Sequence, residues 1–371
     1  MRINTFLLSV LFLLCGEINA QDYYLYVAAE SEDEVHLVHF NAETAKAEIA
    51  KTITVGRMPT EIDGPHGLTV SPDGKHWFVS IAHGNPYGWL AKYETGTDEL
   101  VGVTDLGMFP ATMEISDRTG LLYIVNFDLH GPMEPSTVMV VDPDEMEVLS
   151  EIETGIMPHG SRNSTDGNSN YHVSMMSDEL IEVNTITMEV QRTLKLSKMM
   201  EMDHGSMDHS SMNNSQMNHA GMNHNPIEKP TWADPHPTKP FVYVAANGSN
   251  EILEVDTKAW KITRRFNTGK APYNLEVSAD GQLLVASYKG EGSTGIWYLE
   301  TGEELAKLAN TRRVSHGVTI SPDNKFAFIS VEGIGGEAGS VDVIDLEKLE
   351  VVDFVETGKQ AGGIYFWKME S

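Results

Sequence analysis

The chain of 371 residues has a single cysteine, Cys15, and few basic residues for its size. Cys15 belongs to the amino-terminal leader described below, so we expect the mature chain to form no disulfide and to offer no thiol nucleophile or thiolate ligand. Lysine and arginine number 26 against 54 aspartates and glutamates, which leaves a net charge of −28. Nucleic acid and anionic membrane surfaces would repel such a chain at long range, whereas cations would be attracted to it.

The amino-terminal apolar run, Phe6 to Leu14, is too short to span a bilayer, which takes about 20 residues. It follows the basic Arg2 and precedes a small-residue cleavage site at Ala20, so residues 1–20 are predicted to be a secretory signal peptide cleaved after Ala20. We therefore expect a periplasmic or secreted protein with no membrane span after cleavage. Retention of the leader as an anchor, or lipidation at Cys15, is the less favoured alternative.

Similar segments recur along the rest of the chain. Each starts with an alternating strand, continues through a turn that is often of the Asp-Gly type, and is followed by a second apolar strand, as between Pro65 and Ile81. Most starts are 42 to 48 residues apart, and one interval of 72 residues contains an insert. The starts lie near Pro65, Pro110, Pro158, Pro230, Pro272, Ser315 and Ala361.

Four short antiparallel strands in about 45 residues are typical of one blade of a β-propeller. The carboxyl terminus offers only a first strand, Gly363 to Lys368, whereas Tyr23 to Gly56 offers only the other three. Together, the two termini complete a seventh blade and close the ring. The sequence therefore predicts an all-β fold in which residues 21–371 form one seven-bladed β-propeller of four-stranded blades.

Two motifs connect this repeat with a known family. The segment Tyr243 to Asn247, followed by Glu251 to Asp256, and the segment Pro272 to Gly281 resemble the YVTN-type repeat of secreted bacterial seven-bladed propellers, which are similar in turn to lactonase-like propellers. The resemblance covers the mature chain outside the insert. It implies the fold and does not choose a function, because propellers serve as binding modules, scaffolds and enzymes.

The insert, residues 198–229, contains five consecutive pentapeptides that each begin with methionine, and four of them have histidine in third place. A period of five fits neither a helix nor a strand, so we expect the insert to be disordered. Thioether and imidazole groups together suit copper, and the tract resembles the Met/His-rich tracts of periplasmic copper-resistance proteins. Its predicted copper ligands are Met202, His204, Met207, His209, Met212, Met217, His219, Met222 and His224.

Three propeller histidines occupy one position of the repeat, at the start of the inner strand. Because inner strands converge on the propeller axis, His66, His159 and His316 are expected to face one another at one mouth of the channel. We call this the upper mouth; it is the side of the loops that join successive blades. His83, His130 and Met176 fall in loops on the same side and complete the predicted metal site. For any single histidine, turn chemistry with the imidazole capping a backbone group is the favoured explanation, and the metal site rests on the common position of all three.

These patterns favour a non-enzymatic copper-binding propeller for sequestration, tolerance or delivery of copper, in which the insert feeds the histidine cluster. A periplasmic copper protein is the expected partner, and a monomer is expected because a closed ring leaves no sheet edge. Two alternatives stay open. One is a copper-dependent oxidoreductase with the histidines as its catalytic centre. The other is a lactonase-like hydrolase, or an interaction scaffold, whose insert buffers metal.

Overall fold

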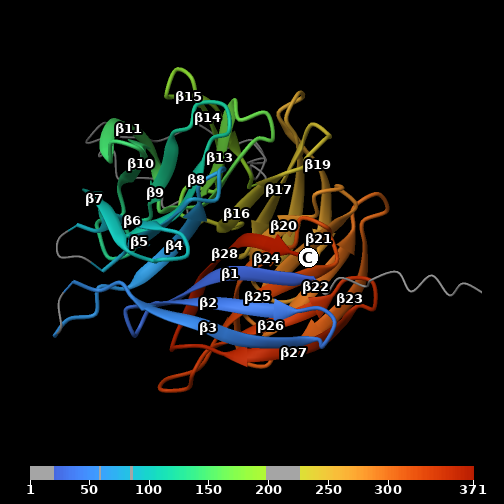
Figure 1. Cartoon of the computed structure of the whole chain (residues 1–371). Coiled ribbons are helices and arrows are strands. Elements are labelled where there is room, and N and C mark those ends of the chain that lie inside the picture. The colour runs from blue at the N-terminus through green and yellow to red at the C-terminus, as the bar shows by residue number, and fades with distance from the viewer. Residues whose placement is uncertain (1–20, 58–59, 84–86, 198–225) are drawn as a thin grey trace, which may run out of the picture.

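The computed structural model describes residues 21–57, 60–83, 87–197 and 226–371, and the structural statements below refer to these residues. Their strands form seven four-stranded antiparallel sheets around one axis (Figure 1). The predicted all-β, seven-bladed propeller is therefore confirmed. Within the described ranges, no helix is long and apolar enough to cross a membrane.

Six blades are continuous in sequence, and each begins with its innermost strand. Their strands are β4 (Pro65–Val70), β5 (His76–Ile81), β6 (Trp89–Glu94), β7 (Leu100–Asp105); β8 (Pro110–Ile115), β9 (Leu122–Asn126), β10 (Pro135–Asp142), β11 (Glu147–Ile156); β12 (Pro158–Asn163), β13 (Ser169–Ser174), β14 (Glu179–Asn184), β15 (Glu189–Lys195); β16 (Pro230–Pro235), β17 (Phe241–Ala246), β18 (Glu251–Asp256), β19 (Lys261–Asn267); β20 (Pro272–Val277), β21 (Leu283–Tyr288), β22 (Ser293–Tyr298), β23 (Glu303–Ala309); and β24 (Val314–Ile320), β25 (Phe326–Glu332), β26 (Ser340–Asp345), β27 (Glu350–Glu356).

The seventh blade joins the two ends of the chain, as the sequence predicts. Its order is β28 (Ala361–Glu370), β1 (Asp22–Ala29), β2 (Glu34–Asn41) and β3 (Lys46–Thr54). Figure 1 shows the red strand β28 beside the blue strand β1, and the two pair antiparallel from Asp22 with Glu370 to Ala29 with Ala361. This pairing closes the ring with the carboxyl terminus as an innermost strand.

The core consists of apolar layers between neighbouring blades. Trp77 of β5, for example, stacks on Tyr26 of the terminal blade at 4.8 Å and on Tyr93 of its own blade at 4.2 Å between ring centroids. The innermost strands lie so close together that a Cβ atom added at Gly67 would be 1.8 Å from the carbonyl oxygen of Ala111. Glycine after each channel histidine is therefore a packing requirement.

Every innermost strand has a β-bulge or register shift in its first half, for example between Pro65 and Leu68. In a regular strand, the second and fifth residues of a blade would face opposite sides, but the extra residue of the bulge turns both toward the channel. The second residues of the seven innermost strands form an upper ring, and the fifth residues form a lower ring. In β24, the count starts at Ser315 and not at Val314, the first residue of the strand. The upper ring is His66, Ala111, His159, Thr231, Tyr273, His316 and Gly362, and the lower ring is Thr69, Glu114, Arg162, Asp234, Glu276, Thr319 and Tyr365.

Candidate functional site

The upper ring brings the three predicted histidines together. The ring centroid of His66 lies 6.1 Å from that of His159 and 6.0 Å from that of His316. All three side chains are buried at the inner wall of the channel. Hydroxyl groups of neighbouring strands hold their backbones in place, since Thr112 donates to the carbonyl oxygen of His159 and Ser287 to that of His316.

His159 has partners on both ring nitrogens. Its Nδ1 lies 2.8 Å from the carbonyl oxygen of Thr231 and therefore carries the proton, while its Nε2 accepts from the Tyr273 hydroxyl at 3.1 Å. Burial lowers the pKa of His159 to about 3, so the imidazole is neutral at physiological pH. Burial also lowers the pKa values of His66 and His316. The Nδ1 atoms of these two are buried without a hydrogen-bond partner among the described residues.

Charged side chains at the ends of second strands surround this ring. Glu30, which follows β1, accepts a hydrogen bond from Nε2 of His83, which follows β5, at 2.7 Å. Lys289, which follows β21, donates to Glu332 at the end of β25 at 3.0 Å. The Glu332 carboxylate also lies 3.6 Å from Nε2 of His316. The upper mouth thus combines two carboxylates, an ammonium group and imidazoles.

The interactions of Glu30 set the charges of this group. Burial by itself would raise the pKa of Glu30, but the hydrogen bond from His83 and the nearby charges of His66 and Lys289 lower it overall. The same hydrogen bond raises the pKa of His83. Glu30 is therefore an anion that orients His83 and favours protonation of its imidazole.

The other predicted ligands of the upper mouth pack around aromatic rings. The centroid of Phe109 lies 5.1 Å from that of His83 and 6.1 Å from that of His130. Met176 is partly buried and packs against an apolar cluster that contains Phe109 and Phe127. The predicted ligands of the insert, from Met202 to His224, lie outside the described residues.

In this arrangement, the described part of the chain contains no group of three or more histidine, cysteine, aspartate or glutamate side chains placed to hold a metal ion. Both nitrogens of His159 are engaged, so a copper ion shared by the three histidines would have to displace Tyr273. His66 and His316 have the imidazole chemistry that copper accepts. The copper site at the upper mouth stays a prediction.

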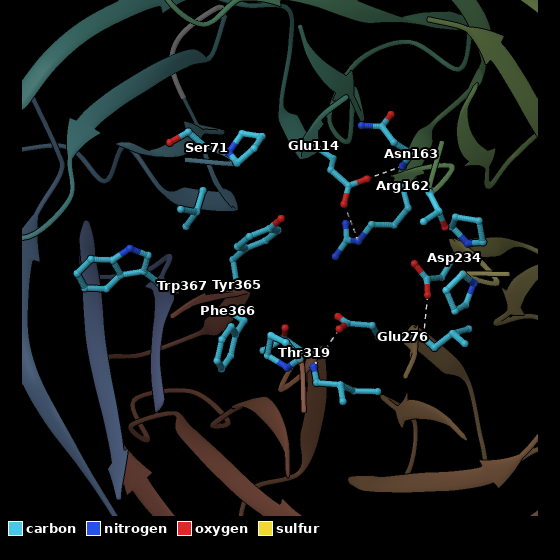
Figure 2. Close-up of a pocket in the computed structure, with 18 of the residues that line it drawn as sticks. Ser71, Glu114, Arg162, Asn163, Asp234, Glu276, Thr319, Tyr365, Phe366 and Trp367 are labelled. Carbon is cyan, nitrogen blue, oxygen red and sulfur yellow. Dashed lines mark hydrogen bonds and ion pairs between the residues drawn. The ribbon is translucent and has the colours of Figure 1, made fainter. Parts of the chain in front are cut away.

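Six members of the lower ring, all except Thr69, line a cavity of about 440 Å³ at the opposite mouth (Figure 2). Three of its members are carboxylates, and each accepts the backbone N–H of the sixth residue of the next innermost strand. Asp234 accepts from Val277 at 2.8 Å and Glu276 from Ile320 at 3.0 Å. Glu114 accepts in the same way from Asn163. These bonds fix the carboxylates at the channel wall.

Burial raises the pKa of all three carboxylates of the lower ring. That of Asp234 is well above its ordinary value, and the nearby charge of Glu276 raises it further. Burial raises the pKa of Glu276 to about 7 and that of Glu114 in the same direction, although the Arg162 guanidinium opposes both shifts. These carboxyl groups are therefore partly protonated near neutral pH.

Removal of one of these carboxylates is expected to stabilise the protein above neutral pH. Because the pKa of Glu276 is about 7 in the folded state against an ordinary value of 4.5, its contribution to stability is fully present below pH 4.5 and is lost as the pH rises through 7. Glu276→Gln keeps an oxygen for the Ile320 N–H and should raise Tm by about 2–4 °C at pH 8. Thermal unfolding at pH 4 should show almost no shift, and equal shifts at both pH values would contradict this explanation.

Sequence reasoning missed most of the charged groups at both mouths. Tyr273 has the same repeat position as the channel histidines, so alignment of the repeats by position would have revealed it. The same alignment would have grouped the lower-ring residues at the fifth position, although only the bulges show that these residues face the channel. Glu30, Lys289 and Glu332 each lie at or just after the end of the second strand of their own blade. This position is harder to align between repeats, because the length of the second strand varies from blade to blade.

A scan against protein-family models and a search of curated protein sequences each found no match. Among solved structures, the chain is similar to the periplasmic gluconolactonase of Pseudomonas aeruginosa, with a TM-score of 0.71 over 94% of this chain and 99% of that one. The sequence identity is 14%, so the likeness is one of fold. It agrees with the propeller fold that the repeats predict.

Proposed function

We propose that this protein is a periplasmic hydrolase of cyclic esters whose active site is the upper mouth of the propeller. The hydrogen bond between Glu30 and His83, beside the ion pair of Lys289 and Glu332, is the observation that carries the proposal. An imidazole oriented by a buried carboxylate is a general base, and a nearby ammonium group can stabilise an oxyanion. The fold of a gluconolactonase supports the choice of a lactone as the substrate class.

In the proposed reaction, Glu30 holds Nε2–H of His83, which leaves Nδ1 to take a proton from a water molecule. The water oxygen bonds to the lactone carbonyl carbon, and the Lys289 ammonium stabilises the resulting oxyanion. The ring C–O bond then breaks, and the proton held by His83 passes to the leaving oxygen. The product is the ring-opened hydroxy acid, and His83 returns to its starting state.

Hydrolysis of D-glucono-1,5-lactone by the mature protein tests the proposal. We expect acid release in a pH-stat at a rate that rises in proportion to protein concentration above the spontaneous rate. The heat-denatured protein is the control for buffer and surface effects. A rate equal to the spontaneous one, for this substrate and for γ-butyrolactone, would rule out a lactonase.

We also propose a second function, in which the Met/His insert captures copper at the upper mouth. The observation that favours it is the place where the insert joins the propeller. The chain leaves after β15 and returns before β16, where the N–H groups of Ile227 and Lys229 donate to Asp178 at 2.7 and 2.8 Å. This connection lies between two blades on the side of the channel histidines, and the net charge of −28 attracts cations.

Replacement of every methionine and histidine between residues 199 and 225 by serine is expected to remove most of the bound copper. The variant keeps the length of the insert, so the neighbouring blades should be undisturbed. The copper count per chain, measured by elemental analysis after Cu(I) loading and desalting, should fall by several ions. A variant with His66, His159 and His316 replaced by alanine shows in parallel whether a tight site exists at the upper ring. An unchanged count in the serine variant would end the proposal for the insert.

A further inference from the structure

The lower mouth is a built cavity, distinct from the proposed active site. Its walls come from the fifth residues of six innermost strands and from the turns that follow them. Its volume of about 440 Å³ is within the range of small-molecule sites. Figure 2 shows Arg162, Asp234 and Glu276 on one side and Tyr365 and Trp367 on the other.

The lower mouth contains hydrogen-bond donors that the protein itself does not use. Nη1 of Arg162 donates to the carbonyl oxygen of Ser161 at 2.9 Å, and its Nε lies 3.9 Å from Glu114. The other guanidinium N–H groups have no acceptor within the described chain, although the Arg162 side chain is only 12% exposed.

Further polar atoms without a hydrogen-bond partner lie next to Arg162, around a small cavity between the two rings. A cavity of about 20 Å³, with room for about one water molecule, separates the lower ring from the upper ring. Nε1 of Trp232 and Oδ1 of Asn274 line it, and both are buried without a partner in the part of the chain that the structure describes. Polar groups left unpaired inside a protein are costly, so their presence indicates that water or a ligand pairs with them.

The acceptors of the lower mouth are equally available. Asp234 and Glu276 each use one oxygen for a backbone N–H and retain a second oxygen, which accepts a hydrogen bond when the carboxyl group is ionised and donates one when it is protonated. A molecule that satisfies both these acceptors and the Arg162 donors must itself both donate and accept hydrogen bonds at many points. Hydroxyl groups do both. The aromatic faces of Tyr365 and Trp367 offer an apolar wall for the C–H groups of such a molecule.

We propose that the lower mouth is a second ligand site, which binds a neutral polyhydroxylated molecule of monosaccharide size. A cationic amine would suit the three carboxylates but would be repelled by Arg162 and leave its donors unpaired. An anionic sugar acid would pair with Arg162 but be repelled by the carboxylates. The neutral polyol is the class that both halves of the cavity accept.

Saturation-transfer NMR and calorimetric titration of the mature protein with D-glucose, D-galactose and D-mannose test the inference, with putrescine and D-gluconate as charged comparators. We expect at least one hexose to bind at one site per chain and to bind more tightly than either charged compound. Asp234→Asn should weaken hexose binding at least tenfold, and Trp367→Leu should reduce transfer to the sugar C–H protons. Asp342→Asn is the matched control, because Asp342 is a buried aspartate that also accepts a backbone N–H, from Thr311, but lies on the third strand of its blade.

Glu30→Gln should leave hexose affinity unchanged, which separates this site from the proposed lactonase site. Absence of binding by all three hexoses would overturn the inference, as would tighter binding of putrescine. If Asp234→Asn fails to fold, Trp367→Leu carries the test alone, and unchanged hexose affinity in that variant would place the sugar elsewhere. A hexose whose binding is lost in Glu30→Gln would belong to the upper mouth and would also overturn it.

Discussion

Glu30→Gln is expected to lower kcat/KM for lactone hydrolysis by about 100-fold or more. Glu30 acts through His83, so it is a positioning residue for the proposed base. The amide of glutamine removes the negative charge that orients the imidazole and favours its protonation. Steady-state kinetics with D-glucono-1,5-lactone, corrected for spontaneous hydrolysis, measure the effect.

The pH profile separates this role from a structural one. The base must be neutral to take a proton, and Glu30 raises the pKa of His83, so wild-type activity should rise with pH through that raised value. In Glu30→Gln, the residual activity should rise at lower pH, because the hydrogen bond that raises the pKa is weakened. Glu182→Gln is the matched control, because Glu182 is buried in an ion pair with Arg192 away from the channel. An equal loss of activity in both variants would contradict a specific role for Glu30.

Deletion of residues 361–371 is expected to abolish the folded state. These residues form β28, the innermost strand of the terminal blade, which pairs with β1 along its whole length. The deletion would expose Tyr23 and Tyr26, both fully buried, and leave β1 as an unpaired inner edge of the terminal blade. Net stabilities of domains are only about 5–15 kcal/mol, and the loss of a whole inner strand exceeds this.

Circular dichroism and calorimetry measure this second effect. The truncated chain should show no cooperative thermal transition. Removal of Glu370 and Ser371 alone is the control and should shift Tm by about 2 °C or less, since both residues are exposed at the end of β28. A cooperative transition near the wild-type Tm in the longer deletion would show that the terminal blade does not close the ring.

The amino-acid sequence by itself determined the architecture. A repeat of about 45 residues, with turns at fixed offsets, defines a blade because a four-stranded sheet can bury its faces only against neighbouring sheets. The incomplete repeats at the two termini predicted the shared blade of β28 and β1 to β3, and the structure confirms it. The common repeat position of His66, His159 and His316 also predicted that they meet at one mouth of the channel.

Only the tertiary structure decided what surrounds those histidines and what lies at the other mouth. Glu30, Lys289 and Glu332 come from three different blades, so their association depends on closure of the ring. The lower ring depends on the bulge in each innermost strand, which turns the fifth residue toward the channel against the simple alternation of a strand. A bulge is set by close packing between neighbouring strands, which no local pattern of residues records.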